Sequence, residues 1–378
     1  MIRLAFRNLF QSKAHLAISV GGVALALMLM LALGAVFTGA EKQITAFIDR
    51  AGANVFVAQK GVRNLHMVSS WLPSSVVGEV SSVQGVQSVT PIMYVAGMVD
   101  TGKERNLAYI VGLPPDPAMG KAWRVVEGAA APAPGAIVLD RAVAAQSGLR
   151  LGDTVKVLGR QLRIAGLSEG TVSITNSVAF ITMDDFERMR GASGESVRTQ
   201  AVSFVLVKAA PGEEPDALAE RIEVEVEGVT AQSSEAFARQ ERNLVKDMAA
   251  DVLTIMNLVG FAIGLAVMSL TIYTATLARR AEYGALKALG ARSRDLYGAV
   301  LTQAVVSVTL GLALGVAFTL GLSALLPVFG STVALQVSGE SLAQVVIASL
   351  IIAAVAALLP IRQIAGLDPA AVFRRRIQ

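Results

Sequence analysis

Charged residues are missing from four long stretches of the chain, and polar segments lie between them. The four stretches are residues 14–40, 252–278, 296–327 and 341–361. Each is at least as long as the roughly 20 helical residues that cross a hydrocarbon core. The third belongs to an uncharged run that continues to Gly339, and Pro327 is expected to end its helix. The pattern therefore predicts four transmembrane helices.

The polar segment between the first two apolar stretches has the pattern of a folded domain. Its periodicity predicts strand, helix and strand over 53–59, 73–84 and 86–99, and again over 201–208, 214–227 and 228–232. Pro and Gly interrupt the segment between these two halves, at about 120–195, and short strands are expected there. We therefore expect a mixed α/β domain with an inserted β-rich lobe.

The end of this segment contains neither Gly nor Pro. Residues 233–251 run directly into 252–278, so 233–278 can form one helix of 46 residues. At about 1.5 Å per residue such a helix reaches roughly 70 Å, more than twice the thickness of the hydrocarbon core. We expect residues 233–251 to form a stalk that projects from the membrane. The alternative is a separate surface helix.

Composition agrees with a membrane protein. The chain is 53% hydrophobic and 16% charged, with a mean hydropathy of +0.57, which is too apolar for an ordinary soluble domain. The first apolar stretch follows a basic, amphipathic segment over 1–13 and is longer than the apolar part of a signal peptide, so we expect an uncleaved anchor. Cysteine is absent, which excludes disulfides and thiolate metal sites.

Basic residues predict the orientation of the chain. Lys and Arg lie in segments 1–13, 279–295 and 362–378, whereas 328–340 has none. The positive-inside rule places both termini and the 279–295 loop in the cytoplasm. Residues 41–251 then lie outside, and they hold 21 basic and 25 acidic residues, so the basic pI reflects topology rather than nucleic-acid binding. The predicted fold is an α-helical membrane protein with four transmembrane helices plus a large mixed α/β extracytoplasmic domain.

The cytoplasmic loop has the pattern of a short amphipathic helix. Tyr283, Leu286, Leu289 and Leu296 are expected to share one apolar face, and Gly290 to break the helix. Such a helix can lie on anionic lipid or dock into a groove of a cytoplasmic partner. A third interpretation is a solvated basic anchor with no partner.

Several segments resemble one family. They are "RRAEYGALKALGARSRDL" from Arg279, the tail "LPIRQIAGLDPAAVFRRR", the N-terminal "LAFRNLFQSKAHLAISVGGVALALML" and the lobe segment "GAIVLDRAVAAQSGLRLGDTVKVLGRQLRIAGL". Together they resemble the FtsX/MacB-like permeases of ABC transporters, in which the pattern R-x-E-x-G-x-L-x-A-L-G-A follows the second span. The resemblance assigns coupling to the ATPase to Arg280, Glu282, Tyr283, Gly284, Leu286, Lys287, Leu289, Gly290 and Arg292.

The resemblance also implies an assembly. It implies a MacB-like periplasmic core domain, a homodimer of permeases in the bacterial inner membrane, and two separate ATPase subunits that bind ATP and Mg and drive the permeases by mechanotransmission. The chain has no G-x-x-x-x-G-K-[ST] phosphate loop, so hydrolysis is expected in the partner. MacB itself carries a fused ATPase at its N-terminus, whereas this sequence begins almost directly with a span, and we expect a stand-alone permease subunit.

Small residues within the spans predict close helix packing. Gly260 and Gly264 form one G-x-x-x-G pair and Gly311 and Gly315 another, which lets helix backbones approach within one subunit or across a dimer. We favour packing within one subunit. No charged residue lies inside any predicted span, which argues against a relay for ion-coupled transport.

Few residues outside the loop suggest chemistry. His66 and Met67 have side chains that can ligate haem, but a histidine in such a segment is more often a structural residue. His15 is expected at the membrane interface, and Asp184 and Asp185 have the pattern of a helix N-terminus. No catalytic or metal-binding motif is found, so we expect a transport subunit and not an enzyme.

The resemblance leads to one functional hypothesis and one alternative. The first is an exporter or extractor of an amphiphile, such as a lipid, lipoprotein, hydrophobic peptide, drug or haem, with or without a periplasmic adaptor protein. Its substrate is expected to contact the apolar residues Leu33, Phe37, Leu253 and Met256, and the permease itself is expected to contact membrane lipids. The alternative is a signalling subunit that activates an extracytoplasmic partner such as a cell-wall hydrolase. A membrane-anchored enzyme is disfavoured.

Overall fold

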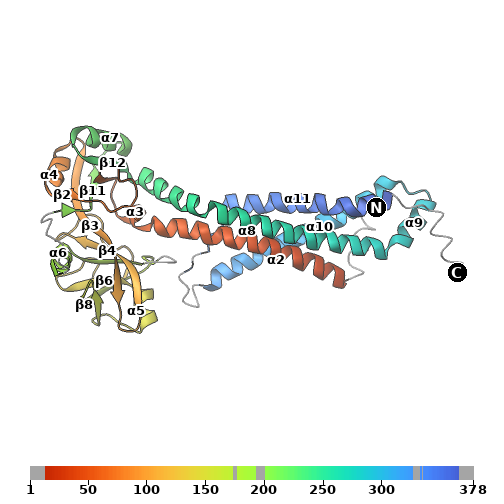
Figure 1. Ribbon diagram of the computed structural model, residues 1–378, viewed down its shortest axis with the longest axis horizontal. Helices are drawn as coiled ribbons and strands as arrows, with labels where there is room; N and C mark the ends of the chain where they lie inside the picture. Colours follow the sequence, from red (N-terminus) through yellow and green to blue (C-terminus); the bar gives the residue numbers. More distant parts are fainter. Residues whose placement is uncertain (1–12, 173–176, 193–200, 327–332, 334, 366–378) are drawn as a thin grey trace. The chain divides into compact units, whose positions relative to one another are not determined.

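The computed structural model describes residues 13–172, 177–192, 201–326, 333 and 335–365 (Figure 1). The predicted N-terminal segment 1–13 and the tail after residue 365 therefore fall almost entirely outside the described residues. The chain divides into two compact units. The helical unit comprises residues 1–38, 249–329 and 335–378, and the sheet unit comprises residues 39–248 and 330–334.

Four long helices carry the apolar stretches. They are α2 (Lys13–Ile44), α8 (Ser234–Ala278), α10 (Ser293–Leu325) and α11 (Gly339–Ala365). Among the described residues these four are long and apolar enough to cross a membrane. Their backbone hydrogen bonds are satisfied internally, which hydrocarbon requires of any spanning segment. The predicted four-helix architecture is confirmed.

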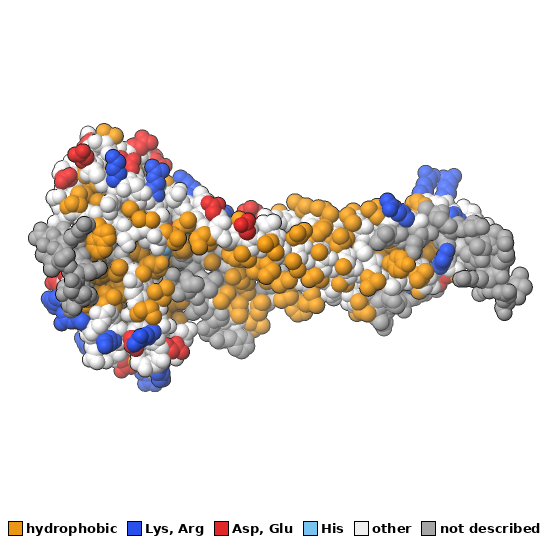
Figure 2. Space-filling model, viewed as in Figure 1, with side chains coloured by type: hydrophobic (Ala, Val, Ile, Leu, Met, Phe, Trp, Pro, Cys, Tyr) orange, Lys and Arg blue, Asp and Glu red, His pale blue; other side chains and the backbone are white. Residues whose placement is uncertain are grey.

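The helical unit is built around α2. Buried side chains from all four helices form one cluster, which includes Leu27 of α2, Met268 of α8, Val300 of α10 and Ile352 of α11. The opposite faces of α8, α10 and α11 are apolar but exposed, with Ile255, Phe318 and Leu350 among the exposed side chains. Figure 2 shows this hydrophobic surface along the long helices. Such surface fits a hydrocarbon environment.

The sheet unit contains the two predicted strand-helix-strand halves. The first is β1 (Val55–Gln59), α4 (Ser75–Ser82) and β3 (Val86–Asp100), and the second is β11 (Phe204–Ala209), α7 (Pro215–Glu225) and β12 (Val229–Ser233). Their strands lie in the order β12-β1-β11-β3, and every neighbouring pair is antiparallel. This is the ferredoxin-like βαββαβ arrangement. The short strands β2 (Leu72–Pro73) and β10 (Ala201–Val202) pair separately.

The inserted lobe is a closed ring of strands. Its strands are the second half of β3, β4 (Arg105–Leu113), β6 (Ala136–Asp140), β7 (Thr154–Val157), β8 (Arg160–Ser168) and β9 (Ser177–Thr182). They pair in the order β3-β4-β9-β6-β8-β7, and β7 returns to β3. The strand β5 (Val125–Gly128) pairs with β8 in antiparallel orientation. Helix α5 (Arg141–Ser147) follows β6 in the chain, and helix α6 (Met183–Ala192) follows β9.

The lobe begins earlier than the predicted position near residue 120. Strand β3 pairs with β11 as far as Ile92 and with β4 from Met93 onward, so one strand belongs to both sheets. Pro91 lies beside the point where β3 changes partner, but the strand runs through it without a turn, and for this reason the pattern placed β4 outside the lobe. The mixed α/β fold class is confirmed.

Two helices contribute to the core of the sheet unit. The five-residue helix α3 (Ala46–Arg50) follows α2 after Thr45 and buries Phe47 and Ile48. The first turns of α8 bury Phe237 and Ala238 in the same cluster, together with Phe56 of β1. The rings of Phe56 and Phe237 are stacked with centroids 5.1 Å apart. The beginning of α8 is therefore a structural part of the sheet unit.

Candidate functional site

The predicted coupling loop contains a short helix with a defined end. Helix α9 (Arg280–Ala288) lies between α8 and α10 in the chain. It is followed by Gly290 in the left-handed conformation, with φ of +94°. The N–H of Ala291 donates to the carbonyl of Leu286 over 3.0 Å, and the N–H of Gly290 donates to that of Lys287 over 3.2 Å. These two bonds form a Schellman motif, which favours Gly at its left-handed position.

One face of α9 packs into the helical unit. Tyr283 is 4% exposed and joins the cluster that holds Leu296 and Val300 of α10, and Leu286 packs against the same cluster. Gly284 is also buried. Since each helical residue advances by 100°, Leu286 follows Tyr283 on this face. Tyr283, Gly284 and Leu286 therefore hold α9 on the helices beside it.

Leu289 does not belong to this face, so the predicted apolar face is wrong at that position. Its side chain is 84% exposed. Six residues after Tyr283, it lies well round the helix from that residue, and the turn at Gly290 then directs the chain away. Arg280, Glu282 and Arg292 are exposed as well, whereas Lys287 is half-buried. The residues assigned to coupling thus separate into the inward set above and an exposed set of Arg280, Glu282, Leu289, Gly290 and Arg292.

The four span glycines pack within one chain. An ideal Cβ at Gly260 would lie 2.7 Å from the Cγ of Met30, and one at Gly264 would lie 3.2 Å from the Cβ of Ala26. Both neighbours belong to α2. The pair on α10 also faces α2, since a Cβ at Gly311 would lie 2.8 Å from a methyl carbon of Val23. Helix α2 therefore approaches α8 and α10 where each carries its G-x-x-x-G pair.

The residues proposed to contact substrate lie on α2 and α8. Leu33 and Phe37 of α2 and Leu253 of α8 are half-buried, and Met256 is 44% exposed. They remain candidates by their apolar character alone.

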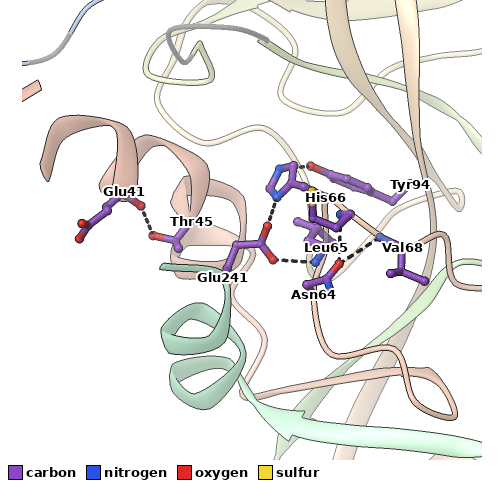
Figure 3. Close-up of polar contacts among 9 residues, drawn as sticks. Glu41, Thr45, Asn64, Leu65, His66, Val68, Tyr94 and Glu241 are labelled. Carbon is purple, nitrogen blue, oxygen red and sulfur yellow. Dashed lines mark hydrogen bonds and ion pairs between the residues drawn. The ribbon is translucent and has the colours of Figure 1, made fainter. Parts of the chain in front are cut away.

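The side chain of His66 is 8% exposed and is hydrogen-bonded within the chain. Its Nδ1 lies 2.5 Å from a carboxylate oxygen of Glu241, and its Nε2 lies 3.0 Å from the hydroxyl of Tyr94 (Figure 3). Both ring nitrogens therefore have partners within the chain, which favours the structural interpretation of His66 over haem ligation. Glu241 and Tyr94 were not singled out in the sequence, where they lie far from His66 and belong to no motif.

Clusters of potential metal ligands are absent from the described residues. In the part of the chain that the structure describes, no three His, Asp or Glu side chains come together in a way that could hold a metal. Asp185 in the first turn of α6 accepts hydrogen bonds from the backbone N–H of Gly135 and the hydroxyl of Thr182, both over 2.7 Å. This acidic residue is thus occupied in a structural role.

Two family models match most of the chain. The MacB-like periplasmic core domain matches residues 16–225, and the FtsX-like permease C-terminal domain matches residues 254–369. An uncharacterized ABC transporter permease of Mycobacterium tuberculosis is 24% identical over 99% of each chain. A second such permease, of Methanocaldococcus jannaschii, is 21% identical over 99% of this chain and 97% of its own.

More distant similarities involve parts of the chain. A macrolide export ATP-binding/permease protein, MacB 2 of Yersinia pestis, is 31% identical over 30% of this chain and 16% of its own length. The crystal structure of the periplasmic region of MacB from Actinobacillus actinomycetemcomitans covers 50% of this chain and 93% of its own at 16% identity, with a TM-score of 0.36. The extracellular domain of the transporter YknZ from Gram-positive bacteria gives a TM-score of 0.35 at 13% identity and covers 48% of this chain and 99% of its own.

The two family models together establish what kind of protein this is. One covers nearly all of the first long helix and most of the sheet unit, and the other covers α8 from residue 254 onward together with α9, α10 and α11. The protein is thus a multi-pass membrane protein with an extracytoplasmic domain, and as an ABC permease it works with a partner ATPase. The resemblance stated from the sequence is confirmed: the chain belongs to the FtsX/MacB-like permeases of ABC transporters and carries a MacB-like periplasmic core domain.

Proposed function

We propose that this permease couples ATP hydrolysis in a separate ATPase subunit to movement of its extracytoplasmic domain, and thereby exports or extracts an amphiphilic substrate. The ATPase binds ATP and Mg on the cytoplasmic side of the bacterial inner membrane. Both termini and α9 lie on that side, and two copies of the permease form the transporter. The substrate is a lipid, lipoprotein, hydrophobic peptide, drug or haem.

The observation that carries the proposal is the continuity of α8. This helix begins in the core of the sheet unit and continues without a break to Ala278, just before α9. Its 45 residues contain no Pro and correspond to about 68 Å at 1.5 Å per residue. An unbroken helix with both ends held in packed structure transmits displacement, because neither end can move independently of the rest of the helix.

The surface of α9 supports docking of the ATPase. Arg280, Glu282 and Arg292 present charge of both signs, and Leu289 presents an exposed apolar side chain among them. This mixture suits a protein groove, in which an apolar anchor is surrounded by charged residues that select the partner. On the inner face, Tyr283 holds α9 against the helices, so a push on α9 reaches α10 and the end of α8.

The proposal is tested with the permease and its ATPase reconstituted in lipid nanodiscs. Glu282→Lys reverses an exposed charge of α9 and is expected to abolish binding of the ATPase, with an unchanged melting temperature. Glu235→Lys, an exposed position of α8 in the sheet unit, is the matched control and is expected to behave as the unaltered chain. Full ATP-dependent turnover in Glu282→Lys would contradict the assignment of α9 as the coupling helix.

The same nanodiscs separate transport from signalling. Turnover of ATP is measured with haemin, with a triacylated lipopeptide and with phosphatidylglycerol added in turn. Stimulation by one of these amphiphiles is the expected result. Stimulation by an added cell-wall hydrolase, with no response to the amphiphiles, would instead favour the signalling alternative.

A further inference from the structure

A buried polar network joins α8 to the rest of the sheet unit. Glu241 lies two turns into α8 and is 0% exposed. One carboxylate oxygen lies 2.5 Å from Nδ1 of His66, and the other accepts the backbone N–H of Leu65 over 2.8 Å. His66 in turn contacts the hydroxyl of Tyr94 on β3 over 3.0 Å (Figure 3). Three segments distant in the sequence thus meet at one histidine.

The hydrogen bonds of this network are mutually consistent. In the tautomer that carries its proton on Nδ1, His66 donates to a carboxylate oxygen of Glu241. The Nε2 atom then accepts the hydroxyl proton of Tyr94. Burial, together with Tyr109 and the charge of Glu241, raises the pKa of Tyr94 well above its ordinary value, so the phenol keeps this proton. Every polar atom of the His66 ring therefore has a partner.

The network is held rigidly by the groups around it. The ring of His66 meets that of Tyr109 edge to face at 4.4 Å, and the ring of Tyr109 stacks on that of Tyr94 at 5.1 Å. The loop that carries His66 is fixed by Asn64, whose side-chain oxygen accepts the N–H groups of Met67 and Val68, each over 3.0 Å. These contacts restrict the position of the histidine ring.

The hydrogen bonds of Glu241 fix the rotation and axial position of α8, which its apolar contacts do not. Phe237 and Ala238 bury apolar surface, and burial of this kind is largely indifferent to small rotations or shifts of a helix. The two hydrogen bonds of Glu241 depend on distance and angle, so they specify both the rotation and the axial position of α8. The ion pair between Lys246 and Glu41 is more exposed and, at 3.8 Å, contributes little.

Tyr94 lies where a displacement of α8 reaches both sheets. Strand β3 pairs with β11 as far as Ile92 and with β4 from Met93, so Tyr94 is next to the residue at which β3 enters the lobe. We propose that Glu241, His66 and Tyr94 are positioning residues that lock α8 to β3, so that movement of α8 is delivered to the extracytoplasmic domain without slippage. The delivery of movement rests on the proposed function, whereas the lock itself does not.

The lock is tested by distance measurements on spin-labelled full-length chain in complex with its ATPase in nanodiscs. The sequence has no cysteine, so labels can be placed at will. Val224 of α7 and Met248 of α8, which are 86% and 67% exposed, report the position of α8 on the sheet unit. Labelled chain is diluted with unlabelled chain so that only distances within one copy are measured. A single narrow distance is expected in the unaltered protein.

Three variants then test whether Glu241 fixes the position of α8 on the sheet unit. Glu241→Ala is expected to lose the single narrow distance. Glu241→Gln retains an acceptor for Leu65 and a hydrogen-bonding partner for His66, so it is expected to restore that distance. Glu235→Ala, which removes only an exposed ion pair with Arg239 on the same helix, is the matched control and is expected to have no effect. A second label pair at Val224 and Val126, within the domain, verifies that it remains folded.

A third pair of labels separates the lock from the proposed function. Labels at Val126 of the lobe and Leu320 of α10 report movement of the domain between nucleotide-free and vanadate-trapped states. A shift in the unaltered chain that disappears in Glu241→Ala, with ATP turnover retained, supports the full proposal. A shift absent from the unaltered chain overturns the proposed function, while the Val224 and Met248 pair still decides the lock. A narrow distance retained in Glu241→Ala overturns the lock.

Discussion

Gly315 of α10 lies directly against the backbone of Ala24 in α2. An ideal Cβ at Gly315 would be 3.0 Å from the carbonyl oxygen of Ala24 and 3.2 Å from the backbone nitrogen of Met28. Backbone atoms of a packed helix cannot move aside as a side chain can. Gly315→Leu should therefore separate the two helices and cost at least the roughly 1–3 kcal/mol typical of overpacking.

The control for this prediction lies on the same helix. A Cβ at Gly321 would meet nothing within 4 Å, so Gly321→Leu should leave the protein as stable as before. Thermal unfolding in detergent, followed by loss of the monodisperse peak in size-exclusion chromatography, compares the two variants. Equal melting temperatures for both would count against close packing of α2 and α10.

Leu289 should contribute to binding of the ATPase and little to stability. Its side chain is 84% exposed, so Leu289→Ala removes no packing within the chain. If the ATPase buries this leucine, its loss costs about 1.5–3 kcal/mol of binding, or roughly tenfold or more in Kd. Titration of the ATPase onto permease nanodiscs measures this change. A lower melting temperature with an unchanged Kd for the ATPase would show that Leu289 contributes to stability and not to binding, and would refute the prediction.

Phe237 should be needed for the stability of the sheet unit. It is 1% exposed and packs against Phe56 and Phe204 with ring centroids 5.1 and 6.1 Å away. Phe237→Ala should destabilise the unit by about 3–5 kcal/mol through lost burial and the cavity left behind. Urea denaturation monitored by the fluorescence of Trp123, which packs against the same cluster, measures the loss. A loss of unfolding free energy no larger than that of a surface substitution would contradict the burial of the first turns of α8 in the core of the sheet unit.

Tyr94 should make stability depend on alkaline pH. Burial raises the pKa of Tyr94 above the ordinary value of 10.0, so the unfolded chain releases its proton at a lower pH than the folded chain does. The contribution is constant below about pH 10, and stability then falls as the pH rises further, by at most about 1.4 kcal/mol per pH unit.

Tyr94→Phe should reduce this alkaline loss, although Tyr109, whose pKa is also raised by burial, continues to contribute. Near neutral pH the variant should be less stable by about 1–3 kcal/mol, because Nε2 of His66 loses its buried partner. Melting temperatures between pH 8 and about pH 11 test both parts. If the melting temperature falls equally steeply with pH in the variant and in the unaltered protein, Tyr94 is excluded as the titrating group.

The apolar residues of α9 were predicted correctly from local pattern, except for Leu289. The spacing of Tyr283, Leu286 and Leu296 indicated an apolar face, and these three residues are buried or half-buried in the structure. Leu289 fits the hydrophobic pattern equally well but is exposed, because Gly290 ends the helix beside it. Composition alone does not distinguish a leucine that packs within the chain from one left for a partner.

The sequence by itself determined the elements whose formation depends on residues close to one another in the chain. The four long helices follow from uncharged stretches, since hydrocarbon requires each span to satisfy its own backbone. The two strand-helix-strand halves follow from local periodicity, and the family follows from short motifs such as that from Arg280 to Ala291.

Only the tertiary structure decided which distant residues meet. Strand β3 passes from one sheet to the other between Ile92 and Met93, within one continuous strand and with no turn to mark the change. Glu241 and His66 are 175 positions apart, and nothing near either residue identifies its partner. A buried carboxylate is stable only when the folded chain brings hydrogen-bond donors to it, and that condition is met by long-range packing and not by local sequence.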